Sequence, residues 1–161
     1  MATRVIERRG ADALDEIASL WHALKNHHAE CTPGIPVRGD DESWALRRSD
    51  YEGWLAQPGA FLLLAREDDR PVAYALVRIQ EAGPTWLEPD RYAIVQDIAV
   101  AATARGGGIG RALLDRVHSE SGCDMVELVV LSANASAKAF YERLGFEPFA
   151  ETLRRRAQWD T

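Results

Sequence analysis

The fold is decided by residues 95–110, VQDIAVAATARGGGIG, in which an apolar strand leads into a glycine-rich turn. Directly after the turn, apolar side chains recur at helical spacing at Ile109, Leu113, Leu114 and Val117. A strand, a glycine-rich turn and a helix in this order direct backbone N–H groups out of the positive end of the helix. Such a turn can hold a pyrophosphate, while the alternative interpretation is a connection whose glycines only permit the turn.

Two common phosphate-binding loops do not fit these glycines. A Walker A loop continues with Lys and then Ser or Thr, but here Gly110 is followed by Arg111 and Ala112. In a dinucleotide-binding turn, Arg111 or Leu113 would stand at the third glycine, depending on where the count begins, and no acidic residue closes a second strand afterwards. The turn therefore belongs neither to a Walker A loop nor to a dinucleotide-binding turn.

Outside this stretch, periodicity and turn residues predict the order strand, two helices, three strands, helix, strand, helix, strand. Asp12 is expected to cap the first helix, and Gly145 is expected to close the last one. This order is typical of an α/β protein whose ligand binds where a turn joins a strand to a helix. The predicted strands lie at residues 5–8, 61–65, 71–79, 92–100, 125–131 and 149–158, and the helices at 12–28, 42–56, 109–117 and 134–144.

Length and composition indicate one compact domain over residues 1–161, with 47% hydrophobic residues. Lys and Arg number 19 against 25 Asp and Glu, and the net charge of -6 argues against a nucleic-acid partner. The sequence carries no signal peptide and no window near the ~20 apolar residues that span a bilayer, which predicts a cytoplasmic protein without a membrane partner. Cys31 and Cys123 are expected to be free thiols, with one disulfide as the alternative.

A second block, NASAKAFYERLGF at residues 134–146, follows the first motif. Residues 95–114 and this second block together resemble the acetyl-CoA motifs of the GNAT N-acetyltransferase superfamily, and the spacing between them is similar as well. The close resemblance covers residues 95–146, and the order of elements extends it more weakly to the whole chain. It implies a mixed, mostly antiparallel β-sheet with helices on both faces and a central strand pair that splays at residues 92–100 to admit acetyl-CoA.

The resemblance also implies which residues hold the cofactor. The main chain of residues 98–100 would pair with the pantetheine arm, residues 105–110 would hold the pyrophosphate, and Asn134 would contact the cofactor near the pantetheine. Ala101-Ala102 replaces the usual Asp-Pro and Gly107 replaces a frequent basic or polar residue, so the phosphate charge would rest more on Arg105 and Arg111. The implied cofactor-binding set is Ile98, Ala99, Val100, Arg105, Gly106, Gly107, Gly108, Ile109, Gly110, Arg111, Asn134, Lys138 and Tyr141.

Attack of an amine on a thioester needs a base for the ammonium and a proton for the departing thiolate. A base is needed because an alkyl ammonium with a pKa of about 10.4 is almost wholly charged at neutral pH. The resemblance implies Asp97 as the first candidate, since members of the family often carry an acid at one or both of the positions of Gln96 and Asp97; the alternative is that Asp97 orders a loop or pairs with an arginine. Tyr141 suits the acid role, because a phenol with a pKa near ~10 is protonated at pH 7. Its alternative is core packing.

The residues that could bind the acceptor amine form a less specific pattern than the cofactor motifs. His27 and His28 follow the first helical stripe at spacings that do not suit a metal site, and they are alternative bases or solvated groups. Trp44 and Trp86 could line an acceptor pocket or cover the sheet. The leading prediction is acetyl transfer to a small primary amine; the alternatives are protein N-terminal or lysine acetylation and a non-catalytic acyl-CoA-binding domain. A homodimer is left open.

Overall fold

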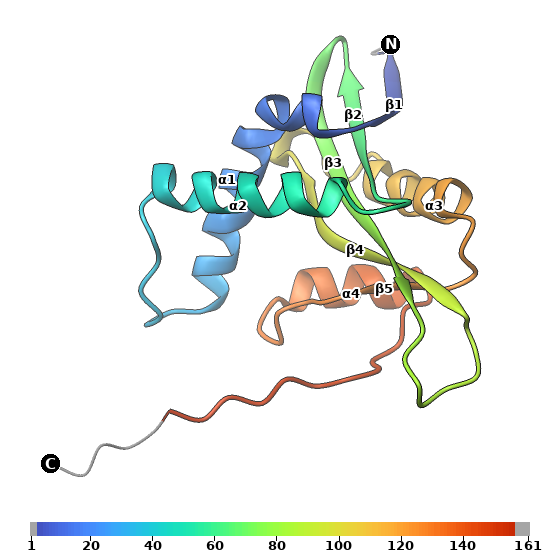
Figure 1. Cartoon of the computed structure of the whole chain (residues 1–161). Helices are drawn as coiled ribbons and strands as arrows, with labels where there is room; N and C mark the ends of the chain where they lie inside the picture. Colours follow the sequence, from blue (N-terminus) through green and yellow to red (C-terminus); the bar gives the residue numbers. More distant parts are fainter. Residues whose placement is uncertain (1–2, 157–161) are drawn as a thin grey trace, which may run out of the picture.

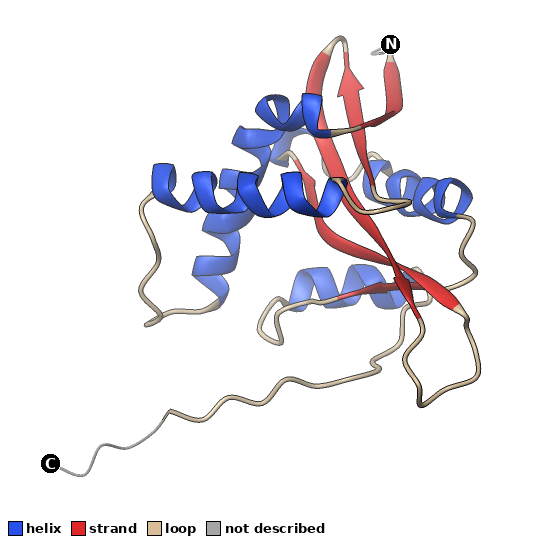
Figure 2. Cartoon of the chain, in the orientation of Figure 1, coloured by secondary structure: helices blue, strands red, loops and turns tan. Residues whose placement is uncertain are grey.

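The computed structural model describes residues 3–156, which form one mixed sheet with helices on both faces (Figures 1 and 2). The strands lie side by side in the order β1-β2-β3-β4-β5, and every neighbouring pair is antiparallel except the parallel pair β4–β5. The elements are β1 (Arg4–Arg9), α1 (Leu14–Cys31), α2 (Asp40–Leu55), β2 (Phe61–Glu67), β3 (Arg70–Glu81), β4 (Arg91–Val100), α3 (Ile109–Ser121), β5 (Val126–Leu128) and α4 (Ala135–Arg143).

The sheet carries a separate hydrophobic core on each face, because successive strand residues point to opposite sides. One core contains Leu62, Leu64, Tyr74 and Leu76, packed under α1 and α2. The intervening residues of β2 and β3 face α3, whose buried apolar side chains are Ile109, Leu113, Leu114 and Val117. Both strands are therefore apolar throughout, and the sheet is sandwiched between two helical layers.

Helix α1 begins and ends differently from the sequence prediction. Asp12 lies in a short 3-10 turn before α1, where its carboxylate accepts hydrogen bonds from Gly10 N and from the Arg9 side chain. It is not the N-cap of α1, which is Ala13 without a side-chain cap. Because no helix-breaking residue occurs before Pro33, α1 also continues past His28 to Cys31.

A β-bulge in β4 divides that strand into two parts. Asp97 pairs with Leu76 and Val95 pairs with Val77, so Gln96 is an extra residue in β4. Val95 packs into the core under α3, whereas Asp97, two residues on, reaches the opposite face and hydrogen-bonds α2. Without the extra residue, the two side chains would lie on one face.

The same bulge marks where β4 and β5 part. Only residues 93–95 of β4 pair with β5, and within the described chain no strand pairs with the following stretch of β4 on that side. The expected splayed pair is confirmed, and it explains why β5 is shorter than the predicted strand at residues 125–131: after Leu128 its neighbour has diverged.

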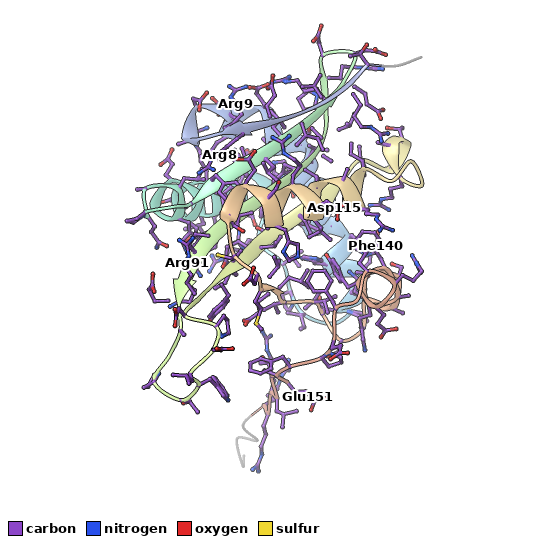
Figure 3. All side chains as sticks on the ribbon, turned by 90° about the vertical axis from the view of Figure 1, so that its right-hand side faces the viewer. Arg8, Arg9, Arg91, Asp115, Phe140 and Glu151 are labelled. Atoms are coloured by element: carbon purple, nitrogen blue, oxygen red, sulfur yellow. The ribbon has the colours of Figure 1, made fainter. Side chains whose placement is uncertain are left out.

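Helix α4 packs against α3 through a close approach at Gly110. A Cβ at Gly110 would come within 3.0 Å of the Phe140 ring, which lies between the two helices (Figure 3). Gly145 has φ 86°, in the left-handed region, and directly follows the C-cap of α4, as predicted for a helix end. Glycine is therefore required at 110 for packing and at 145 for backbone conformation.

The predicted last strand at residues 149–158 is wrong as far as the structure describes it, and residues 157 and 158 lie outside the described part. Residues 147–156 are exposed and have no strand neighbour, and the segment leads away from the sheet (Figure 1; Glu151 in Figure 3). Pattern alone cannot supply the ladder partner that a strand needs. None of the described helices is long and apolar enough to cross a membrane.

Candidate active site

The unpaired edge of β4 offers backbone groups to an extended ligand. Residues 98–100 pair with residues 73–75 of β3 on one side, while β5 stops short of them on the other side. Ile98 and Val100 pack toward α3 and Ala99 packs toward α1, so only backbone is presented at the open edge. An amide-containing arm such as pantetheine can add to an edge of this kind as a strand would.

The glycine-rich turn leads from this edge into α3 and fits a pyrophosphate. Gly106 and Gly108 have φ values of 81° and 77°, and a Cβ at either would meet no atom within 4 Å. No backbone carbonyl among residues 3–156 accepts a hydrogen bond from the N–H groups of residues 108–110. Unpaired N–H groups at the start of a helix are the usual partners of phosphate oxygens.

Arg4 of β1 holds the middle of this turn. Its Nη1 donates to Gly107 O at 2.8 Å, and its Nη2 lies 2.5 Å from Glu67 Oε1. A Cβ at Gly107 would stand 3.0 Å from Arg4 Nη2, so glycine at 107 makes room for the arginine. The backbone of the turn is thus fixed by a residue about a hundred positions away in the sequence.

The basic side chains predicted to bind the cofactor are exposed: Arg105 in the turn, Arg111 on α3 and Lys138 on α4. Arg105 is exposed and donates from Nε to Val100 O at 3.2 Å. Arg111, also exposed, lies 3.9 Å from Asp115 on the surface of α3. Lys138 is exposed on α4. All three can turn toward an anion without breaking a buried contact.

Asp97 is the centre of a buried polar cluster. The Tyr51 hydroxyl donates to Asp97 Oδ2 at 2.5 Å and lies 2.9 Å from the Tyr74 hydroxyl, and Arg47 Nε lies 3.9 Å from the same carboxylate oxygen. Only 14% of the Asp97 side chain is exposed. Burial raises the pKa of Asp97 above the usual 3.8, against the opposing effects of the Tyr51 hydrogen bond and the charges of Arg47 and His28. A carboxylate with a raised pKa is a better proton acceptor near neutral pH.

Tyr141 lies on α4 on the other side of the splay. Its ring packs against Phe140 and Phe146, with ring centroids 5.3 and 5.6 Å away. Burial, followed by the nearby negative charge of Asp97, raises the pKa of Tyr141 to about 12. The phenol therefore keeps its proton at neutral pH, and its hydroxyl makes no hydrogen bond within residues 3–156.

The two predicted histidines have different surroundings. His27 Nε2 lies 3.2 Å from Asn134 Oδ1, and Asn134 caps α4 by accepting from Ala137 N. His28 is half-buried, and burial lowers its pKa although Asp97 opposes the change. His28 thus adjoins the Asp97 cluster, and His27 links α1 to the start of α4.

The two predicted tryptophans are not brought together. Trp44 packs against Trp21 and Tyr51 within the core under α1 and α2. Trp86 is 62% exposed in the β3–β4 loop, where it contacts Phe149.

Comparison with known proteins identifies the family of this chain. The profile of the acetyltransferase (GNAT) family matches residues 21–146. The chain belongs to this family. A mycothiol acetyltransferase of Brachybacterium faecium is 31% identical over 139 residues, which is 83% of this chain but 42% of that protein, so the chain spans less than half of this relative.

Solved structures agree on the fold of this GNAT domain. A mutant of the BH1408 protein from Bacillus halodurans has a TM-score of 0.81 at 24% identity, covering 96% of this chain and 99% of its own. An aminoglycoside N-acetyltransferase, AAC(6')-Iy in complex with CoA, has a TM-score of 0.69 at 18% identity, covering 99% and 97%. The match over residues 21–146 confirms the predicted family, and the AAC(6')-Iy complex shows that a protein of the same fold binds CoA.

Three residues of the polar cluster around Asp97 were not predicted from the sequence of this GNAT domain. Tyr51 and Arg47 lie on α2 and Tyr74 lies on β3, so no short motif joins them to Asp97. The bulge gave no signal in the sequence, because residues 92–95 and 98–100 are all apolar and show no alternation.

Proposed function

We propose that this GNAT domain transfers an acetyl group from acetyl-CoA to the primary amine of a small molecule by direct attack on the thioester. The observation that carries the proposal is the position of Asp97 and Tyr141 on opposite sides of the splay between β4 and β5, close enough for the charge of Asp97 to raise the pKa of Tyr141. A proton acceptor and a proton donor are what the reaction requires at the two ends of the transfer.

The proposal of a small acceptor draws on two observations. The relative from Brachybacterium faecium and others at 31–37% identity are named mycothiol acetyltransferases, a name that refers to a small molecule. In addition, α1 and α2 cover the face on which Asp97 lies, so the approach to this carboxylate is flanked by the side chains of Arg47 and His28. Such surroundings suit a compact amine.

Asp97 is the proposed base. Acetyl-CoA supplies the acetyl group as an activated thioester when bound, and Asp97 Oδ accepts the proton that the acceptor ammonium must lose, directly or through a water. Tyr51 keeps the carboxylate oriented, because its hydroxyl donates to one oxygen and leaves the other available. Removing a proton at this position leaves the nitrogen lone pair to form the new N–C bond as the C–S bond breaks.

Tyr141 is the proposed acid. Its hydroxyl carries a proton at neutral pH, since its pKa is raised to about 12. When the C–S bond breaks, the electron pair remains on sulfur, and Tyr141 Oη can give it a proton. From the ammonium to the neutral amide, nitrogen loses two protons and sulfur gains one, so one proton is released to solvent as solvent returns Tyr141 and Asp97 to their starting states.

A thiol-release screen tests the proposal, with the acetylated product identified by mass spectrometry. The panel contains small amines, amino acids, aminoglycosides and peptides, each with acetyl-CoA and wild-type protein. We expect release that depends on a small amine and is lowered in Asp97→Asn. Asp115→Asn on the exposed surface of α3 is the matched control and should behave as wild type.

Two outcomes would contradict parts of the proposal. If acetyl-CoA binds but no amine or peptide is acetylated, the domain is a binding module and the enzymatic claim is wrong. If peptides are acetylated far faster than every small amine, the transfer stands and the acceptor class is wrong.

A further inference from the structure

Arg78 of β3 lies beside the proposed acceptor site and has not yet been given a role. Its guanidinium stacks over the ring of Trp54 on α2, 5.5 Å from the ring centroid. Nε and Nη2 both donate to Gln96 Oε1, at 3.1 and 2.9 Å, and Nη1 lies 3.5 Å from Gln57 Oε1. Gln96 is the bulge residue adjacent to Asp97. Arg78 therefore hydrogen-bonds the residue whose insertion places the Asp97 side chain on the face covered by α2.

The charge of Arg78 is not neutralised by the described part of the chain. Both of its hydrogen-bond partners are neutral amides, and no carboxylate among residues 3–156 forms an ion pair with it. Arg47, which stacks over the same Trp54 ring at 5.5 Å, differs in this respect: Asp97 lies at 3.9 Å and Asp50 at 3.7 Å. A half-buried cation is ordinarily paired with an anion, because burial penalises an isolated charge.

We propose that Arg78, stacked on Trp54 and oriented by Gln96, forms a subsite for an anionic group of the acceptor. The inference rests on the proposed function, and it narrows the acceptor to an amine that also carries a carboxylate or a phosphate. Trp54 covers one side of the guanidinium, and Gln96 accepts from Nε and from one N–H of Nη2, which leaves N–H groups of Nη1 and Nη2 for a two-point contact with an oxyanion.

The position of Arg78 relative to Asp97 sets the spacing expected within the acceptor. Leu76 is the register partner of Asp97, and Arg78 lies two residues further along β3, about 7 Å along the strand. The amine at Asp97 and the anion at Arg78 are therefore separated by a few bonds. An ω-amino acid or an amino-alkyl phosphate has such a spacing.

The test compares acceptors that differ only in the anionic group. The pairs are β-alanine against its amide, γ-aminobutyrate against its amide, and O-phosphoethanolamine against ethanolamine, which also separates a carboxylate ligand from a phosphate ligand. For the better anion, we expect wild-type kcat/KM to exceed that of its neutral partner by about 10-fold or more, as one charge-assisted contact provides. The ratio should fall toward one in Arg78→Met and be partly retained in Arg78→Lys.

Arg70→Met is the matched control, because Arg70 is an exposed arginine at the other end of β3. Circular dichroism and CoA affinity show whether each variant is folded; if Arg78→Met is not, Arg78→Gln takes its place. Equal use of anionic and neutral partners by wild type, or a preference that survives loss of the guanidinium, would overturn the subsite.

A calorimetric titration of the same anionic amines into CoA-saturated protein separates this inference from the proposed function. Binding that depends on Arg78 without any acetylation would retain the subsite and refute the transfer. No binding and no acetylation would refute both.

Discussion

Removing the Tyr51 hydroxyl should move the acid limb of the pH–rate profile to higher pH. The hydroxyl donates to Asp97 Oδ2 at 2.5 Å and thereby stabilises the charged carboxylate, one of the effects that oppose burial in setting the pKa of Asp97. A hydrogen bond to a charged group contributes about 1.5–3 kcal/mol, and one pKa unit corresponds to about 1.4 kcal/mol. Tyr51→Phe should therefore raise the pKa of Asp97 by about one to two units.

The direction of this shift follows from the protonation state in which Asp97 can act as a base. The base must be deprotonated to accept a proton, so activity is present above the pKa of Asp97 and is lost as the pH falls through it. Because that pKa is already above 3.8, a further increase shifts the loss toward neutral pH. The measurement is kcat/KM of the best acceptor against pH for wild type and variant, so that the ionisation of the acceptor is common to both.

Tyr74→Phe is the matched control for this shift. It removes an equally buried hydroxyl that lies 2.9 Å from the Tyr51 hydroxyl but forms no hydrogen bond to Asp97 within the described chain. Its acid limb should move less than that of Tyr51→Phe. An unchanged acid limb in Tyr51→Phe, with the protein folded and active, would show that another group controls the profile and that Asp97 is not the base.

Three further predictions concern the acid and the cofactor site. Tyr141→Phe should lower kcat about 100-fold or more with little change in the melting temperature or in CoA affinity, because the hydroxyl makes no hydrogen bond within residues 3–156; kcat within twofold of wild type would refute the acid role. Gly108→Glu should abolish CoA binding in calorimetry by charge and volume, whereas Gly108→Ala, with the same backbone strain at φ 77°, should retain most of the affinity; equal affinities would place the phosphates elsewhere. Acetyl-CoA at about 100 times its Kd should raise the melting temperature by roughly 5–10 °C, and no rise at millimolar concentration would contradict binding.

The elements around the cofactor site could be predicted because local signals agreed there. The apolar strand, the glycines and the helical stripe all lie within residues 95–117, and the structure has a strand, a turn and a helix in those places. The left-handed φ at Gly106 and Gly108 is a local requirement that glycine satisfies directly. Sequence was sufficient where neighbouring residues determine conformation.

The environment of Asp97 could not be predicted in full, because it depends on contacts between distant elements. Tyr51 and Arg47 come from α2, and their approach to Asp97 depends on how α2 packs across the sheet. The role of Gln96 as the bulge residue could not be predicted, because residues 92–95 and 98–100 are all apolar and show no alternation. Residues 149–156 illustrate the same limit, since a stretch of sequence can suggest a strand but cannot provide the neighbour that pairs with it.

Amide hydrogen exchange with and without acetyl-CoA tests the central claim most directly, because it requires no knowledge of the acceptor. The account predicts that acetyl-CoA protects the amides of residues 98–100 on the unpaired edge of β4 and those of residues 106–110 in the turn. The amides of residues 6–9 of β1 and 62–65 of β2, which pair with each other away from the contact of Arg4 with the turn, should exchange as before. Saturating acetyl-CoA that leaves residues 98–110 unprotected, or that protects another surface instead, would contradict it.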